Sequence, residues 1–188
     1  MDIKNIFDQF VQICYERYRI GDSRIYKEEV KSKASLYCLN PYLWSEDDLK
    51  VKFGGFLELE LIKLHSDLTV HSELKLYDSY PKNRADLSIH KVKGDLWLNH
   101  DEIKESLVAV IEIKYANFIF PNYDHAKGHI QYDITKLDTL SNKIEKYLII
   151  FDEGLGIKSD TANEILKKAE EKGIIVLSNN NSFNPKSL

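Results

Sequence analysis

The sequence is short of cysteine, proline, glycine and long apolar runs. Its 188 residues include 2 cysteines, 4 prolines and 8 glycines. Cys14 and Cys38 have no CxxC spacing, which favours reduced thiols over a disulfide scaffold or a zinc cluster. The longest apolar runs, such as residues 148–151, are too short to cross a bilayer, and no apolar leader is evident. We therefore expect a soluble, cytoplasmic (intracellular) protein without a membrane partner.

Positive charge is not in excess either. Lysine and arginine total 26 against 30 acidic residues, a formal net charge of −4. Proteins that coat nucleic acid without specificity are usually basic, so that class is excluded and any nucleic-acid contact must use a local surface.

The sequence has no P-loop and no G-x-G-x-x-G pattern. His125 and His129 are four residues apart, but no third ligand accompanies them, so zinc is not expected.

Hydrophobic residues make up 43% of the chain, too many for a disordered protein, and the length suits one domain. Helical spacing and capping signals predict helices at residues 3–18, 45–65, 124–141 and 161–173. Alternating or continuous apolar patterns predict strands at residues 70–77, 84–91, 106–115, 146–152 and 174–177, with a polar connection at 94–105 that includes a short strand at 96–98. This order predicts an α/β sandwich, a mixed sheet with helices on both faces.

Two predicted elements have informative faces. The strand at 84–91 places Ala85, Leu87 and Ile89 on one face, and the strand at 106–115 is apolar on both faces at its start, which is typical of a central strand. The helix at 45–65 carries an apolar stripe made of Leu49, Phe53, Phe56, Leu57 and Leu64. Gly54 and Gly55 each cost roughly 1 kcal/mol in its interior, which indicates close packing or a kink.

Three charged residues lie on the second and third strands: Asp86, Glu112 and Lys114. Glu112 and Lys114 are two residues apart and so project to the same side of their strand. Carboxylate and carbonyl oxygens suit Mg²⁺, which activates water and stabilises the charge of a scissile phosphate. A lysine beside such a site orients the water or stabilises the transition state. The alternative is a salt bridge at a strand end.

This succession of a helix with an acid, a strand with Asp and a strand with E-x-K resembles the PD-(D/E)XK nuclease superfamily over residues 45–177. The resemblance implies a three-layer α/β/α restriction-endonuclease-like core with a mixed central sheet and extra N-terminal helices. It implies a Mg²⁺-dependent nuclease, with Mn²⁺ as a substitute and DNA as the substrate. Asp86 and Glu112 would hold the metal and Lys114 would be the catalytic lysine. Ala85 stands where the family pattern has proline.

Members of this superfamily often add an acid from the preceding helix and a glutamine from the following one. Glu46 and then Glu60 lie near the middle of the apolar stripe, whereas Glu58 falls on the opposite, solvated side. Glu46 is the first choice as a further metal ligand, although a first-turn acid also suits the helix dipole. Glu73 is a third candidate. Gln131 takes the glutamine position, where it would hold water or phosphate; the alternative is a solvent-facing residue.

The predicted domains are an N-terminal helical addition at 1–44, a nuclease-like core at 45–178 and a flexible tail at 179–188. The N-terminal helices would recognise substrate, pair two subunits or contact a protein partner. A homodimer is left open, because cutting both DNA strands requires two sites. The alternative function is a non-catalytic nucleic-acid- or protein-binding module on the same fold, since a fold does not fix function.

Overall fold

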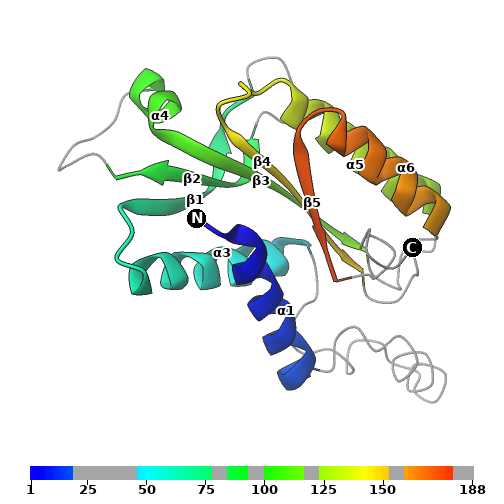
Figure 1. Ribbon diagram of the computed structural model, residues 1–188, viewed down its shortest axis with the longest axis horizontal. Coiled ribbons are helices and arrows are strands. Elements are labelled where there is room, and N and C mark those ends of the chain that lie inside the picture. The colour runs from blue at the N-terminus through cyan, green and yellow to red at the C-terminus, as the bar shows by residue number, and fades with distance from the viewer. Residues whose placement is uncertain (19–45, 78–83, 93–99, 117–122, 153–158, 180–188) are drawn as a thin grey trace.

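The computed structural model describes residues 1–18, 46–77, 84–92, 100–116, 123–152 and 159–179. Within them the chain forms one five-stranded sheet in the order β1-β2-β3-β4-β5 (Figure 1). The first three strands form an antiparallel meander, and β3, β4 and β5 run parallel. The strands are β1 Leu68–Lys75, β2 Arg84–Lys91, β3 Leu107–Ala116, β4 Glu145–Asp152 and β5 Ile174–Ser178.

Helices pack on both faces of this sheet. They are α1 Ile3–Tyr18, α3 Glu46–Lys63, α4 His100–Ser106, α5 Tyr123–Asp138 and α6 Ser159–Glu170. Figure 1 shows α1 and α3 on one side of the sheet and α5 and α6, which connect its parallel strands, on the other. The prediction of an α/β chain with a mixed, helix-covered sheet is confirmed. The predicted short strand at 96–98 and most of the predicted N-terminal addition and tail lie outside the described residues.

Most element bounds differ from the prediction by one to three residues, as at α5, which ends at Asp138 where residue 141 was expected. Strand β1 begins at Leu68, two residues earlier than expected, and ends at Lys75. Part of the predicted polar connection is the short helix α4, which takes in Ser106, the residue predicted to begin the third strand. The hydroxyl of Ser106 donates to the carbonyl of Ile103 at 2.9 Å and so satisfies an acceptor in the last turn of the helix.

The sheet separates two hydrophobic cores. The core beneath α1 and α3 includes edge-to-face contacts of Phe53 with Phe7 and Phe10, whose ring centroids are 5.8 and 5.3 Å away. The core beneath α5 and α6 contains the apolar stripe of α5, which is Ile130, Ile134 and Leu137. Strands β3 and β4 contribute to both cores because helices cover each of their faces.

Strands β1 and β2 exchange faces at one point along their length. Leu87 packs in the α1/α3 core, but Ala85, two residues away, packs in the α5/α6 core. The prediction that Ala85, Leu87 and Ile89 share one face is therefore wrong. The exchange occurs where Glu73 has a φ of 56° and no ladder pair joins it to Asp86, although the pairs on either side are formed. A left-handed residue inside a strand turns the chain and changes which side its neighbours face.

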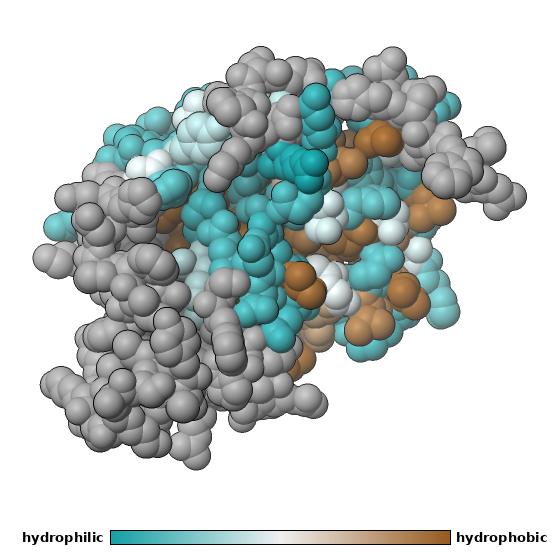
Figure 2. Space-filling view, turned by 180° about the vertical axis from the view of Figure 1, so that it is seen from behind, coloured by the Kyte–Doolittle hydropathy of each residue, from teal (hydrophilic) through white to brown (hydrophobic). Residues whose placement is uncertain are grey.

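Helix α3 is apolar on more than one side. Leu49, Phe53 and Leu57 are buried as predicted, but Leu64 is 66% exposed, so its place in the buried stripe was wrong. Its position past the last residue of α3 explains the error, because the helical period no longer applies there. Figure 2 shows apolar residues exposed among hydrophilic ones on the rear face of the molecule.

Among the described residues, no helix combines the length and the apolar character needed to span a bilayer.

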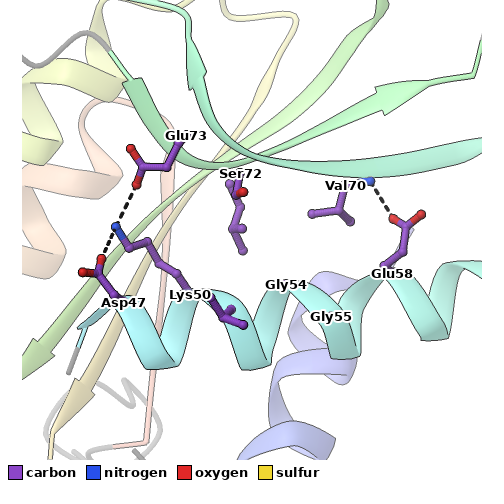
Figure 3. Close-up of a pocket in the computed structure, with 10 residues that line it drawn as sticks. Asp47, Lys50, Gly54, Gly55, Glu58, Val70, Ser72 and Glu73 are labelled. Atoms are coloured by element: carbon purple, nitrogen blue, oxygen red, sulfur yellow. Dashed lines mark hydrogen bonds and ion pairs between the residues drawn. The ribbon is translucent and has the colours of Figure 1, made fainter. Parts of the chain in front are cut away.

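The adjacent glycines of α3 have different surroundings. A Cβ placed on Gly54 would lie 3.0 Å from Cδ2 of Leu87, whereas a Cβ on Gly55 would meet no atom within 4 Å. Close packing of the helix on the sheet therefore applies to Gly54 alone. Both glycines line the pocket between α3 and β1 that Figure 3 shows.

We expect Gly55→Ala to raise the free energy of unfolding by up to about 1 kcal/mol, because alanine favours the helix and the site is open. Gly54→Ala should gain less or destabilise, since the buried Leu87 side chain must move. Urea denaturation of the two matched variants measures the difference. Equal gains would contradict close packing at Gly54.

His90 is a buried histidine at the junction of β2 and α4. Its Nδ1 lies 3.0 Å from Oγ of Ser106 and its Nε2 lies 2.9 Å from Oγ of Ser88. Because Ser106 donates its own hydrogen to Ile103, we assign Nδ1 as the donor; Nε2 then accepts from Ser88, whose contact with the His71 carbonyl is longer, at 3.4 Å. Burial, together with the nearby His71, lowers the pKa of His90 from 6.5 to about 4.

This lowered pKa predicts acid sensitivity. Protonation favours the unfolded chain, so the stabilisation by neutral His90 is complete above about pH 6.5 and is lost as the pH falls toward 4. The melting temperature of the wild type should exceed that of His90→Gln by a constant margin above pH 7. That margin should shrink between pH 6.5 and 4, and a margin that does not change with pH would refute the assignment.

Candidate active site

Two carboxylates lie on neighbouring strands, Asp86 on β2 and Glu112 on β3. The antiparallel register pairs Leu87 with Ile111, and this is the last ladder pair before Asp86 and Glu112. Oδ2 of Asp86 accepts a hydrogen bond of 2.7 Å from the backbone N–H of Ile113. Asp86 therefore lies against the E-x-K segment itself, at the point where β1 and β2 exchange faces.

Glu112 is the most deeply buried acid of this group, at 1% exposure. Both of its carboxylate oxygens are occupied. The hydroxyl of Tyr77 donates to Oε1 at 2.7 Å, and the ammonium of Lys136 donates to Oε2 at 2.9 Å. A buried carboxylate needs such partners, because an unpaired charge in the core is very costly.

The electrostatics of Glu112 reflect this position. Burial first, and the nearby charge of Asp86 second, raise the pKa of Glu112 above its usual range, whereas the charge and hydrogen bond of Lys136 favour the carboxylate. Asp86 thus influences Glu112 as a like charge at close range. Two carboxylates held together in this way form a place where a cation is favoured.

Lys114 projects from β3 into the same group. Its Nζ lies 3.1 Å from Oε1 of Glu46 and 3.0 Å from Oδ2 of Asp133, and it donates to the Ile113 carbonyl at 3.1 Å. Burial disfavours its charged form, but the charges of Asp133 and Glu46 outweigh burial and raise the pKa of Lys114. Lys114 is therefore a cation at any working pH, as expected for a lysine that contacts an anionic substrate.

A further lysine, Lys50, approaches from the first turn of α3. Its Nζ lies 2.8 Å from Glu73 and 2.8 Å from Asp47 (Figure 3). It also lies 3.4 Å from Oδ1 of Asp86. These acids outweigh the effect of burial and raise the pKa of Lys50. Lys50 also lines a pocket of about 460 Å³ between α3 and β1, and neither Asp86 nor Glu112 is among the residues that line it.

The acidic residues of the helix α3 that were considered as metal ligands lie in different surroundings. Glu46 joins the site through Lys114, whereas Glu60 pairs with Lys63 on the surface. Glu58 was placed on the solvated side, but it accepts hydrogen bonds from the N–H of Val70 at 2.6 Å and from the Thr69 hydroxyl at 3.2 Å. It therefore satisfies the outer edge of β1, which the sequence pattern of one helix cannot reveal.

Helix α5 contributes Asp133 and Lys136, which sequence reasoning missed. Gln131, the residue predicted there, is half-buried, and its side chain forms no hydrogen bond in the described part of the chain. It lies about 200° around the helix from Asp133, which is 3% exposed and faces the site. The missed signal was available, since Asp133 lies within the apolar stripe of Ile130, Ile134 and Leu137 and a charge there requires a partner.

The oxygen donors of this site suit a small hard cation. Asp86, Glu112 and the carbonyl of Ile113 are the ligand types that Mg²⁺ takes together with water. Oδ2 of Asp133 is buried and lies 3.0 Å from Nζ of Lys114, so this acceptor is already paired with a lysine. No group of three or more His, Cys, Asp or Glu side chains in the described residues is arranged to hold a metal, so Glu46 does not join Asp86 and Glu112 as a third ligand.

No family model matches this chain, and no curated protein or solved structure is significantly similar to it. The function of the protein must therefore be inferred from the chemistry of the side chains in the site.

The pair of Lys136 and Glu112 provides a stability test. Lys136→Met should lower the free energy of unfolding by about 3–5 kcal/mol, because it leaves a buried carboxylate without its counter-charge. The double variant Lys136→Met/Glu112→Gln should lose less than the sum of the single variants. As a control, Lys168→Met breaks the more exposed pair with Glu164 and should cost no more than about 1 kcal/mol. Additive losses in urea denaturation would show that the two side chains are not coupled.

Proposed function

We propose that the protein is a Mg²⁺-dependent nuclease that hydrolyses phosphodiester bonds in DNA, built on the restriction-endonuclease-like fold. The observation that carries the proposal is the placement of Asp86 beside Glu112, with Lys114 two residues further along β3. Asp86 is anchored by the Ile113 backbone within the E-x-K segment. Asp86 and Glu112 lie on different strands and are 26 residues apart in the sequence, and a chance salt bridge at a strand end would not require them to converge.

Each residue of the site would have its own role in the proposed hydrolysis. Asp86, Glu112 and the Ile113 carbonyl would hold Mg²⁺ or Mn²⁺, which would lower the pKa of an attacking water and stabilise the charge of the scissile phosphate. Lys114 would exchange a carboxylate partner for a phosphate oxygen and stabilise the transition-state charge. Glu46 and Asp133 would hold Lys114 in place before substrate binds.

The charge of the site is predominantly negative. Six acids face the three lysines Lys50, Lys114 and Lys136 through ion pairs: Glu46, Asp47, Glu73, Asp86, Glu112 and Asp133. Six acidic and three basic side chains leave a formal excess of acid, which a divalent cation would partly offset.

A second candidate is a non-catalytic binding module for nucleic acid or protein. The observation that favours it is that the buried acids already have lysine partners, so the group is electrically compensated without a metal. Cation binding separates the two candidates, because a compensated structural network gains no stability from Mg²⁺.

Cleavage of a substrate panel tests the proposal. Duplex, single-stranded and branched DNA and RNA are incubated with Mg²⁺, with Ca²⁺ and with EDTA. We expect cleavage of DNA with Mg²⁺, binding without cleavage with Ca²⁺, whose coordination is looser, and no cleavage in EDTA. Lys114→Ala should lower the cleavage rate by at least about a hundredfold while DNA binding and folding remain.

Lys168→Ala is the matched control, since Lys168 is a half-exposed lysine on α6 away from this group. It should cleave like the wild type. Cleavage in EDTA, or full activity of Lys114→Ala, would exclude the mechanism.

A further inference from the structure

The network contains two side chains that do not contact substrate and that the proposed reaction leaves without a role. Tyr77 follows β1 and Lys136 lies on α5, yet both end on the carboxylate of Glu112. We propose that Tyr77 and Lys136 are positioning residues that fix the carboxylate plane of Glu112 for cation binding. This inference rests on the proposed function.

Tyr77 is suited to hold one oxygen. It is 2% exposed, and its hydroxyl donates to Oε1 of Glu112 at 2.7 Å, a length typical of a strong hydrogen bond to a carboxylate. Burial and the negative charge of Glu112 raise the pKa of Tyr77, so the hydroxyl keeps its proton and remains a donor. The side chain reaches Glu112 because β1 changes faces at Glu73, which directs Leu76 and Tyr77 into the core beneath α5.

Lys136, on α5, donates to the second carboxylate oxygen of Glu112. Its Nζ is 2.9 Å from Oε2 of Glu112 and 3.2 Å from the carbonyl of Arg84, and it lies 4.8 Å from the centre of the Tyr77 ring. The carbonyl, the carboxylate and the ring face together fix the ammonium. Glu112 is thus clamped between two donors, one from the antiparallel part of the sheet and one from the helix after β3.

A clamp of this kind acts on the metal ligand. Hydrogen bonds to a ligating carboxylate fix its orientation, and their loss typically costs 10- to 100-fold in metal affinity or activity. Without Tyr77, Glu112 would lose a donor and rotate, while its burial would remain the same. The effect should therefore fall on cation affinity and on kcat, and the KM for DNA should change little because neither residue contacts the substrate.

The test compares Tyr77→Phe with Tyr147→Phe in the full chain. Tyr147 is a matched control, since its hydroxyl also donates to a carboxylate, Oε2 of Glu145, at 2.7 Å, and it is 5% exposed. Mn²⁺ binding is measured from the free-ion electron paramagnetic resonance signal, and melting temperatures are recorded in EDTA. We expect 10- to 100-fold weaker Mn²⁺ binding for Tyr77→Phe and a change of less than twofold for Tyr147→Phe.

Lys136→Arg provides a second variant that keeps the charge at this position. It should bind Mn²⁺ more weakly than the wild type, because the planar guanidinium does not reproduce the single ammonium contact. It should also retain more affinity than Tyr77→Phe/Lys136→Arg, in which both donors are altered.

The outcomes separate the two hypotheses. If the wild type binds Mn²⁺ and cleaves DNA but Tyr77→Phe binds Mn²⁺ equally well, positioning by Tyr77 is wrong and the proposed function stands. Equal losses of melting temperature with unchanged Mn²⁺ affinity would assign Tyr77 a structural role only, which also overturns the inference. If the wild type neither binds Mn²⁺ nor cleaves DNA, the proposed function fails and the positioning role fails with it.

Discussion

The constraint on which the rest of the site depends is the burial of one negative charge. Glu112 lies inside the core beneath α5 at 1% exposure, in a strand whose one other charged residue is Lys114. A lone carboxylate there would be neutral or would unfold the chain. The fold therefore brings a lysine from α5 and a tyrosine from beyond β1 to its two oxygens. Such a pair stabilises little by itself, but removal of either partner is costly, so the elements that carry them are tied together.

The exchange of faces at Glu73 and Asp86 gives this arrangement its geometry. A regular strand would keep Val70 and Leu74 on one side of the sheet, yet Val70 packs beneath α3 and Leu74 beneath α5. The same irregularity places Asp86 between Lys50 of α3 and the backbone of β3. A left-handed, non-glycine residue is a strained conformation, and such residues concentrate at functional sites. The strain at Glu73 is thus linked to the convergence of charges from both helical layers.

Part of the fold and of the candidate site could be predicted because it depends on local pattern. The order of helices and strands follows from the hydrophobic period, and Asp86, Glu112 and Lys114 attract attention as charged residues beside the apolar residues of their strands. The face of Ala85 and the exposure of Leu64 could not be predicted, since the period fails where a strand turns or a helix ends. The choice of Gln131 over Asp133 failed for a different reason. It followed a family pattern, although the helical period alone would have indicated the charge on the buried face.

The sequence by itself determined the class of fold and the chemical character of the site, because both depend on spacing along one strand or helix. It could not determine which side chains pair with Glu112, since Lys136 and Tyr77 are 24 and 35 residues away and meet it through the packing of α5 and the turn in β1. Which residues form a long-range ion pair depends on which charged groups the packing brings together. The sequence pattern does not distinguish one lysine from another in this respect. The tertiary structure decided that these groups share one buried network.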